Sequence, residues 1–210
     1  MPYVKPNNFF VALIIIIFSF NRHVSAQELI DWKVGSKFSY VSTDMWKKEN
    51  GRWEEHVIDK QGDVYTVSVI EDSKTIQMLV KVDGTFTRPK AEAAGGGTFS
   101  YVPIKLPLVE GSEWEWTYHY IGKNMGAPAQ VSRQCKAGKM EEVTVPAGKF
   151  TARRIDCRGS WTSTAGSSGS ATTKLWYGPS LAVTAKRDET SSYFGGRDGW
   201  TVVLDNIKTD

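Results

Sequence analysis

Glu113 and Glu115 come closest, by residue type and spacing, to a pair of catalytic groups. They lie two apart in a segment that alternates like a β-strand, so both side chains share one face, with α-carbons roughly 6.6 Å apart. Paired carboxylates can cleave glycosidic bonds, provided that one of them is desolvated and keeps its proton. Neighbouring acids on one strand face are more often solvated, and we therefore expect no catalytic role for them.

The other reactive residue types form no catalytic or metal-binding pattern. His119 is separated from Glu115 by roughly 13 Å along such a strand, too far to share a metal ion, and His56 lies in a different segment. The glycines at 95–97 lack the lysine and hydroxyl residue of a phosphate-binding loop, and 166–169 lacks the spacing of a nucleophile elbow. We expect no enzymatic activity, no metal site and no cofactor.

Aromatic residues give the same segment a second candidate role. One face of the expected strand carries Trp114, Trp116, Tyr118 and Tyr120. Such a row of rings could form the floor of a cavity for a lipid or sugar, and Trp176 would join it if the fold brought it to the same concavity. The alternative is that the rings fill the core, where each would stabilise the sheet by roughly 1.5 to 3 kcal/mol. A continuous cavity beneath them would favour ligand binding.

The N-terminus has the layout of a secretory signal peptide. Lys5 precedes an apolar run from Phe9 to Phe20, and small residues at Val24-Ser25-Ala26 come before Gln27. The apolar run is shorter than the roughly 20 residues of a spanning helix, so an uncleaved anchor is the less favoured alternative. We expect cleavage after Ala26 and an exported, periplasmic or extracellular product. No cysteine adjoins the junction, so the attachment site of a bacterial lipoprotein is missing.

The mature chain is nearly neutral. Removal of residues 1–26 leaves 24 basic and 23 acidic residues, a net charge of +1. The basic pairs are isolated, so no long-range field attracts nucleic acid or anionic lipid. We expect no nucleic-acid partner and no integral membrane span after cleavage. A small ligand or an envelope protein is the expected kind of partner.

Cys135 and Cys157 are the two cysteines of the chain. Oxidising compartments favour pairing, and closing this loop would constrain the unfolded chain by about 3 kcal/mol. We expect an internal disulfide, with two buried thiols or an intermolecular bond as alternatives. Two cysteines alone do not make a structural zinc site.

The mature chain, residues 27–210, consists of β-rich runs separated by turns, without a sustained helical period. Val143–Cys157 contains two such runs around Pro146-Ala147-Gly148-Lys149, where proline presets a turn and Gly148 can adopt a positive φ. Within 36–72 we expect short strands, and further strands at about 75–82, 85–88, 113–120, 129–136, 140–145, 149–159, 171–177, 181–189 and 200–206. A mobile loop is expected at 160–170 and a hairpin tip at 193–197. The prediction is an all-β domain, either a strongly curved antiparallel sheet or an open, unclosed β-barrel.

Two halves of this domain begin alike. Trp32–Tyr40 and Leu108–Trp116 both contain Gly-Ser followed at alternate positions by two aromatic residues. A glycine-rich link at 91–97 separates the halves, about 27–90 and 98–210. They could be a duplicated β unit, although chance or shared strand-start chemistry explains the match equally well. We treat them as one domain.

Three blocks of the sequence resemble a known group of proteins. Pro107–Trp114, Val143–Phe150 and Leu175–Val183 are similar to successive blocks of exported bacterial β proteins grouped as domains of unknown function. Those blocks are a strand start, a valine-proline-alanine-glycine hairpin and a tryptophan-tyrosine-x-proline strand. This chain has Leu181-Ala182-Val183 where a glycine is usual. The resemblance covers about half of the mature chain and implies a curved antiparallel sheet, similar in outline to unclosed barrels of periplasmic lipoprotein carriers, without catalytic residues.

From these observations we expect a non-enzymatic periplasmic protein that serves as a binding or envelope-maintenance module for an apolar or amphipathic ligand. The alternative is a structural or protein-interaction domain with a filled core and no small ligand. The two differ in whether a cavity lies beneath the concave face of the sheet.

Overall fold

The structure, a computed structural model, describes residues 29–71, 74–88, 99–121 and 128–209. The predicted signal peptide and the glycine-rich link at 91–97 lie outside the described residues, as does the side chain of Tyr120. The part of the chain that is described contains twelve strands and no helix, and hence no helix that could cross a membrane. The prediction of an all-β protein is confirmed.

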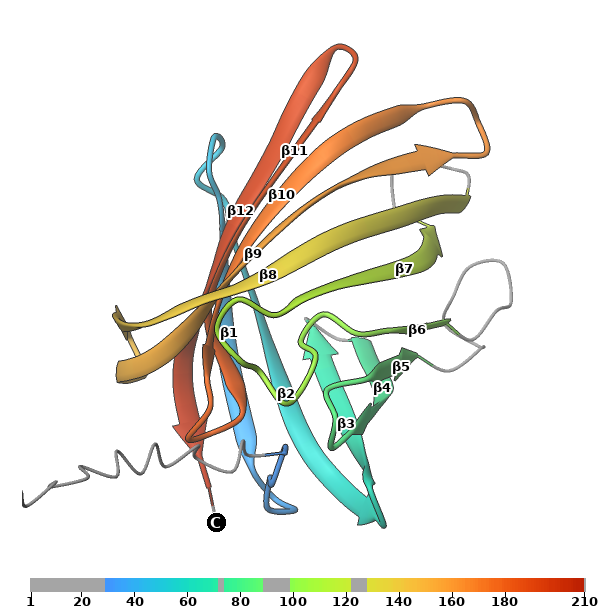
Figure 1. Cartoon of the computed structure of the whole chain (residues 1–210). Coiled ribbons are helices and arrows are strands. Elements are labelled where there is room, and N and C mark those ends of the chain that lie inside the picture. The colour runs from blue at the N-terminus through green and yellow to red at the C-terminus, as the bar shows by residue number, and fades with distance from the viewer. Residues whose placement is uncertain (1–28, 72–73, 89–98, 122–127, 210) are drawn as a thin grey trace, which may run out of the picture.

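The strands follow one another with short connections through most of the chain (Figure 1). They are β1 (Lys37–Asp44), β2 (Asn50–Gln61), β3 (Val64–Glu71), β4 (Lys74–Lys81), β5 (Phe86–Arg88), β6 (Phe99–Tyr101), β7 (Glu113–Ile121), β8 (Pro128–Val145), β9 (Gly148–Ser163), β10 (Ser168–Gly178), β11 (Val183–Tyr193) and β12 (Gly196–Lys208).

All twelve strands belong to one antiparallel sheet in the order β6-β5-β4-β3-β2-β1-β12-β11-β10-β9-β8-β7. Each half of the chain is a meander of six strands, and the two meanders meet where β1 pairs with β12. The sheet curls so strongly that its edges, β6 and β7, come near each other (Figure 1). No ladder joins these two edges within the described residues, so the sheet is an open barrel, as predicted.

The hairpin at 143–157 and the disulfide are also confirmed. β8 ends at Val145, β9 begins at Gly148, and Gly148 has a φ of 134°. Cys135 and Cys157 face each other directly across β8 and β9, with α-carbons 4.0 Å apart, and form a disulfide.

Two details of the predicted strand pattern were wrong. The runs at 129–136 and 140–145 form one long strand, β8, with a register irregularity between Ala137 and Met140. The loop expected at 160–170 shrinks to a turn at 164–167. Its serines and threonines extend the strands because their hydroxyl groups bond across the ladder, as between Ser170 and Ser192 at 2.9 Å.

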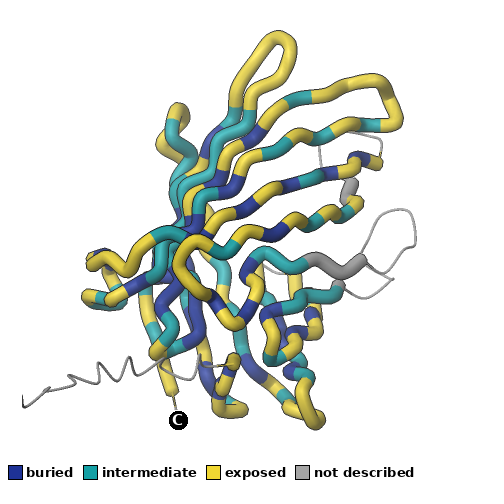
Figure 2. The backbone as a smooth tube through the Cα atoms, in the orientation of Figure 1, coloured by how far each residue is buried: buried dark blue, intermediate teal, exposed yellow. Residues whose placement is uncertain are grey.

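The core fills one end of the barrel. Trp32 lies between Phe38 and Tyr65, with ring centroids 5.7 and 5.5 Å away, and its Nε1 donates to the carbonyl of Leu181. Leu108, in the segment between β6 and β7, is fully buried in the same cluster. The opposite end, where the hairpins β9–β10 and β11–β12 turn, is largely exposed (Figure 2). The barrel therefore has a filled end and an open end.

Candidate functional site

A cavity of about 320 Å³ lies on the concave side of the sheet, next to the filled end. Both halves of the chain contribute to its wall, since β1 to β4 supply one side and β10 to β12 the other. Most of the lining is apolar and includes Ile30, Trp32, Tyr40, Trp53, Val69, Met78, Phe86, Ile104, Leu106, Leu175, Val183 and Val202. Three charged residues, Glu55, Glu71 and Arg187, share this wall.

The charged residues reach the cavity because of strand register. Glu55 lies two residues from Trp53 on β2, and its carboxylate accepts a hydrogen bond of 3.2 Å from the Trp53 indole. Arg187 lies between Leu175 and Val202 on the neighbouring strands. Among the described residues, the Nε of Arg187 is buried and has no hydrogen-bond partner. The cavity thus has mostly apolar walls and is lined by one arginine that has a buried, unpartnered donor.

Tyr40 lies between these charges. Its ring stacks on Trp53, with centroids 5.2 Å apart and planes 16° from parallel. Burial and the Glu55 carboxylate raise the pKa of Tyr40 well above its ordinary value of 10.0, and Arg187 opposes this shift. The phenol is therefore a neutral hydroxyl group at physiological pH, and both charged groups are close enough to affect it.

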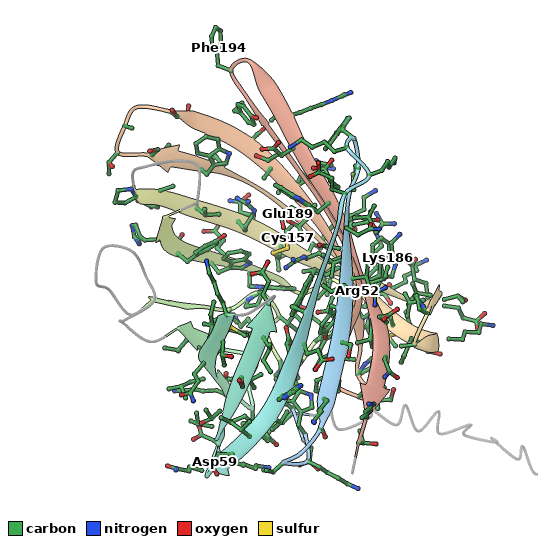
Figure 3. The ribbon with its side chains drawn as sticks, turned by 180° about the vertical axis from the view of Figure 1, so that it is seen from behind. Arg52, Asp59, Cys157, Lys186, Glu189 and Phe194 are labelled. Atoms are coloured by element: carbon green, nitrogen blue, oxygen red, sulfur yellow. A yellow bond between two sulfur atoms is a disulfide. The ribbon has the colours of Figure 1, made fainter. Side chains whose placement is uncertain are left out.

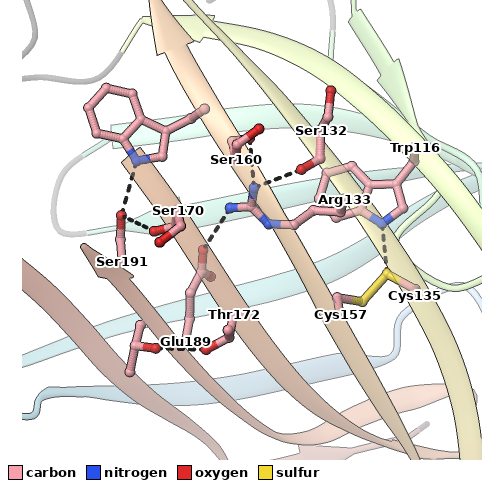
Figure 4. A network of polar contacts seen from close by, with 12 residues as sticks. Trp116, Ser132, Arg133, Cys135, Cys157, Ser160, Ser170, Thr172, Glu189 and Ser191 are labelled. Carbon is pink, nitrogen blue, oxygen red and sulfur yellow. Dashed lines mark hydrogen bonds and ion pairs between the residues drawn. A yellow bond between two sulfur atoms is a disulfide. The ribbon is translucent and has the colours of Figure 1, made fainter. Parts of the chain in front are cut away.

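Arg133 forms a second polar group on the concave face (Figure 4). Only 5% of Arg133 is exposed, and its guanidinium donates to the carbonyls of Ser132 and Ser160 at 3.1 and 3.2 Å. Glu189 on β11 lies 3.8 Å away. Gly159 lies directly opposite on β9, where a Cβ would collide with the backbone of Ser132 and Arg133. The charge is therefore held in place by β8, β9 and β11.

The sequence analysis missed Arg133 and Arg187. Arg133 has the same strand parity as Val131 and Cys135, which are buried, so an inward arginine was visible in the pattern once the strand was recognised. Arg187 offered no comparable signal, because Lys186, Asp188 and Glu189 surround it with other charges.

The predicted aromatic face exists, but it does not line the 320 Å³ cavity. Trp114 is 6% exposed, and its indole donates to the carbonyl of Val102 at 3.1 Å, so this ring belongs to the core. Trp116 is half-buried, stacks on Tyr118 at 5.4 Å and donates to the Sγ of Cys135. These rings lie farther toward the open end of the barrel than Trp114. Their role in ligand binding stays a prediction.

The structure does not bring Trp176 to that face. Trp176 lies between two inward-facing residues of β10, Leu175 and Tyr177, so its ring is on the outer face. Its indole donates to the Glu141 carboxylate, and the Nζ of Lys186 lies 4.7 Å from the ring centroid. Trp176 and Trp116 therefore cannot contact one small ligand on the concave side.

Glu113 and Glu115 lie on the outer face and are exposed. Glu113 pairs with Lys136 at 2.7 Å, and Glu115 accepts a hydrogen bond from Gln134 at the same distance. The bond from Lys136 lowers the pKa of Glu113, which is the opposite of what a proton-holding acid requires. Among the described residues, no three histidine, cysteine or acidic side chains gather as metal ligands.

Comparison with known proteins identifies the fold. No protein-family model and no curated protein matches the chain. One similar crystal structure is that of a predicted exported protein with a YmcC-like fold from Bacteroides fragilis NCTC 9343, with a TM-score of 0.57, 14% identity, and coverage of 88% of this chain and 100% of that one. The chain shares its fold.

A second structure with this fold is a predicted lipoprotein from Parabacteroides distasonis ATCC 8503. The TM-score is 0.55 at 14% identity, and the match covers 86% of this chain and 99% of the other. Both matches agree with the resemblance to exported bacterial proteins that the sequence blocks indicated, and the curved, unclosed antiparallel sheet is that of this chain's own structure.

Proposed function

We propose that this chain is a non-enzymatic envelope protein that binds an amphipathic molecule inside its open barrel. The observation that carries the proposal is the 320 Å³ cavity, whose mostly apolar wall includes Arg187, a residue with a buried and unpartnered Nε. Cavities for small ligands typically begin at about 300 Å³ and combine apolar walls with a few polar groups. This cavity has that composition.

The wall chemistry favours an amphiphile over a wholly apolar molecule. An arginine donor buried without an acceptor costs free energy, which a ligand oxygen would recover. Arg187 and Glu55 carry opposite charges in the same wall, so a head group with a carboxylate or phosphate would be oriented with that group toward Arg187. The ligand's apolar part would contact Val69 and Met78.

An exported location supports the same proposal. The first 26 residues have the pattern of a cleaved signal peptide, and the Cys135–Cys157 disulfide is typical of oxidising compartments. The two proteins that share the fold are described as an exported protein and a lipoprotein.

Native mass spectrometry of protein purified from its own cell envelope tests ligand binding. We expect a co-purifying amphiphile in the wild type and its loss in Val69→Phe, which fills the cavity from β3. The matched control is Val41→Phe, a half-buried valine whose side chain faces outward from β1. Arg187→Met should weaken retention, whereas the exposed Arg52→Met should not. Native mass spectra that show wild-type protein without any bound amphiphile would refute the proposal.

A structural or protein-interaction domain is the second candidate. The burial of Trp114 favours it, because this ring fills the space that a ligand floor would require. In that case the same spectra would show the chain alone or with a protein partner, and Val69→Phe would change only stability.

A further inference from the structure

Phe194 is exposed to an extent that packing does not explain. It sits at the tip of the β11–β12 hairpin, where it is 104% exposed, and projects away from the sheet (Figure 3). Gly195, with a φ of 90°, completes the turn. Hairpin tips are usually polar or glycine-rich, since nothing shields them from water. The ring contributes nothing to the fold, and its position suits a contact outside the chain.

A second ring lies at the same end of the sheet. Trp46, in the turn between β1 and β2, is 41% exposed. The neighbouring Met45 donates its backbone N–H to the carbonyl of Gly199 at 2.9 Å, which fixes this turn to β12. Gly199 has no side chain, and the Trp46 ring occupies the space where a Cβ would be. The exposed indole is therefore held rigidly beside the last hairpin.

Basic residues lie close to Trp46 in space or in sequence. The guanidinium of Arg197 lies 5.0 Å from the centroid of the Trp46 ring, and Lys47 and Lys48 follow in the same turn and are exposed. The carboxylate of Asp44 is engaged by the backbone N–H groups of Trp46 and Lys47. Glu49 is the exposed acid of this turn. We call Trp46, Lys47, Lys48, Phe194 and Arg197 the aromatic rim.

Strand register places this rim at the open end of the barrel. Asp44, the last residue of β1, pairs with Trp200 near the start of β12, whereas Lys37 pairs with Lys208 at the filled end. Ile30 and Trp32 are buried in the core at the opposite, filled end. The rim therefore lies at the end of the barrel that the core leaves unfilled.

We propose that the aromatic rim docks on an anionic lipid bilayer, with Phe194 inserted among the acyl chains and the three cations at the head groups. Projecting aromatic residues flanked by lysine and arginine suit the membrane interface, where rings enter the apolar layer and cations meet lipid phosphates. A protein partner would favour a broad or hollowed apolar surface, whereas Phe194 projects from the tip of a narrow hairpin. The proposal extends the proposed function and does not depend on the cavity.

Co-sedimentation of the mature chain with vesicles tests this docking. We expect binding to mixed phosphatidylethanolamine–phosphatidylglycerol vesicles and about tenfold weaker binding of Phe194→Ser, the loss expected when one large apolar side chain no longer leaves water. The matched control is Val34→Ser, because Val34 is 52% exposed at the filled end. It should bind like the wild type.

The cations are tested by a triple variant, Lys47→Gln with Lys48→Gln and Arg197→Gln. Its binding to the anionic vesicles should fall and lose most of its salt dependence, while binding to pure phosphatidylcholine vesicles stays as weak as that of the wild type. Thermal midpoints of all variants should match the wild type, because the replaced side chains are exposed.

Several outcomes would overturn the proposal. They are an absence of wild-type binding to the anionic vesicles, equal binding of Phe194→Ser and wild type, or capture of a protein through Phe194 without lipid binding. The amphiphile retained by Phe194→Ser in native mass spectra should equal that of the wild type. Failure of docking and failure of cavity binding are thus separate results.

Discussion

The two glycine-serine turns of the chain have similar backbone conformations but precede strands at different positions in the sheet. In the Gly35 turn, residues 32–40, the glycine has a φ of 99°; in the Gly111 turn, residues 108–116, it has a φ of 82°. The N–H of Gly35 donates to the carbonyl of Val57 on β2, and the N–H of Gly111 donates to the carbonyl of Ala137 on β8, both at 2.8 Å. In each case the acceptor strand is the one that pairs with the strand after the turn. The serine carbonyls accept the return bonds at 2.9 Å.

The difference begins after the turn. β1 has a neighbour on each side, whereas β7 is an edge of the sheet. Tyr40, the second aromatic residue after Gly35, is buried in the cavity wall, while Trp116, its counterpart, is only half-buried. Local sequence therefore determines the backbone, and position in the sheet determines burial. A common origin of the halves would explain the shared turn and stays a prediction.

The largest expected effect separates the central strand from the edge. Phe38→Ala should lower the free energy of unfolding by about 3 to 5 kcal/mol, because the ring is buried in the core. Trp116→Ala should cost less than half of that, since its ring is partly solvated. Urea unfolding monitored by circular dichroism measures both. Equal losses of unfolding free energy would show that the edge strand and the central strand are packed alike. Phe38→Leu is the control, because it keeps an apolar side chain and more of the side-chain volume at this position.

The disulfide joins β8 to β9 in the second half, so its removal should affect the two halves unequally. The double variant Cys135→Ala with Cys157→Ala should lose about 3 kcal/mol of unfolding free energy, from the added freedom of the unfolded chain. Reduction of the wild type should reproduce this loss. Hydrogen exchange should accelerate in β8 and β9 more than in β2 and β3; uniform acceleration would contradict the comparison.

The two turns themselves can be compared by matched substitutions. Gly35→Ala and Gly111→Ala should each cost about 1 to 2 kcal/mol, because an L-residue is disfavoured at these positive φ angles. For Gly111 nothing lies near the added methyl group, so the cost there is purely conformational. Thermal unfolding of the two variants gives the measurement. An unchanged unfolding midpoint at either position would contradict the conclusion that both turns share this backbone conformation.

Ala182 differs from the two turn glycines, because it has a positive φ but carries a side chain. Ala182 has a φ of 53° and lies in the block Leu175–Val183, where the resemblance noted in the sequence analysis implies a glycine. Ala182→Gly should raise the unfolding free energy by about 0.5 to 1 kcal/mol, because relief of the strained backbone exceeds the added freedom of the unfolded chain. Differential scanning calorimetry should show a higher unfolding midpoint for Ala182→Gly than for the wild type. The control Ala185→Gly, in the regular strand β11, should have a lower midpoint.

The smallest effect concerns the exposed edge. Lys136 lowers the pKa of Glu113, so the pair stabilises the fold above the ordinary pKa of a glutamate, about 4.3, and this contribution is lost as pH falls through the lowered value. Glu113→Gln should therefore reduce the acid dependence of the unfolding midpoint only slightly. High salt should abolish the difference from the wild type.

Much of the fold was predictable because its signals are local. The alternation from Glu113 to His119, the turn at Gly148 and the disulfide each depend on residues close in sequence or on two cysteines. The pairing of β1 with β12 was not predicted, because no local pattern specifies that two strands separated by residues 45–195 will meet.

The candidate site was harder to predict than the fold. The cavity forms where β1 to β4 and β10 to β12 curve toward each other, so its lining depends on sheet curvature. Trp176 was grouped with Trp114 although it lies between Leu175 and Tyr177. In such an apolar run, alternation of polarity gives no indication of which residue faces inward.

The order of strands also bears on when this protein can fold. The central ladder joins the first strand to the last, so β1 lacks one of its two neighbours until β12 has been synthesised and delivered. A chain crossing a membrane from its N-terminus would expose the β1 edge throughout passage. Completion of the sheet is thereby coupled to arrival of the C-terminal thirteen-residue strand, and a chain truncated before it would leave two separate six- and five-stranded meanders.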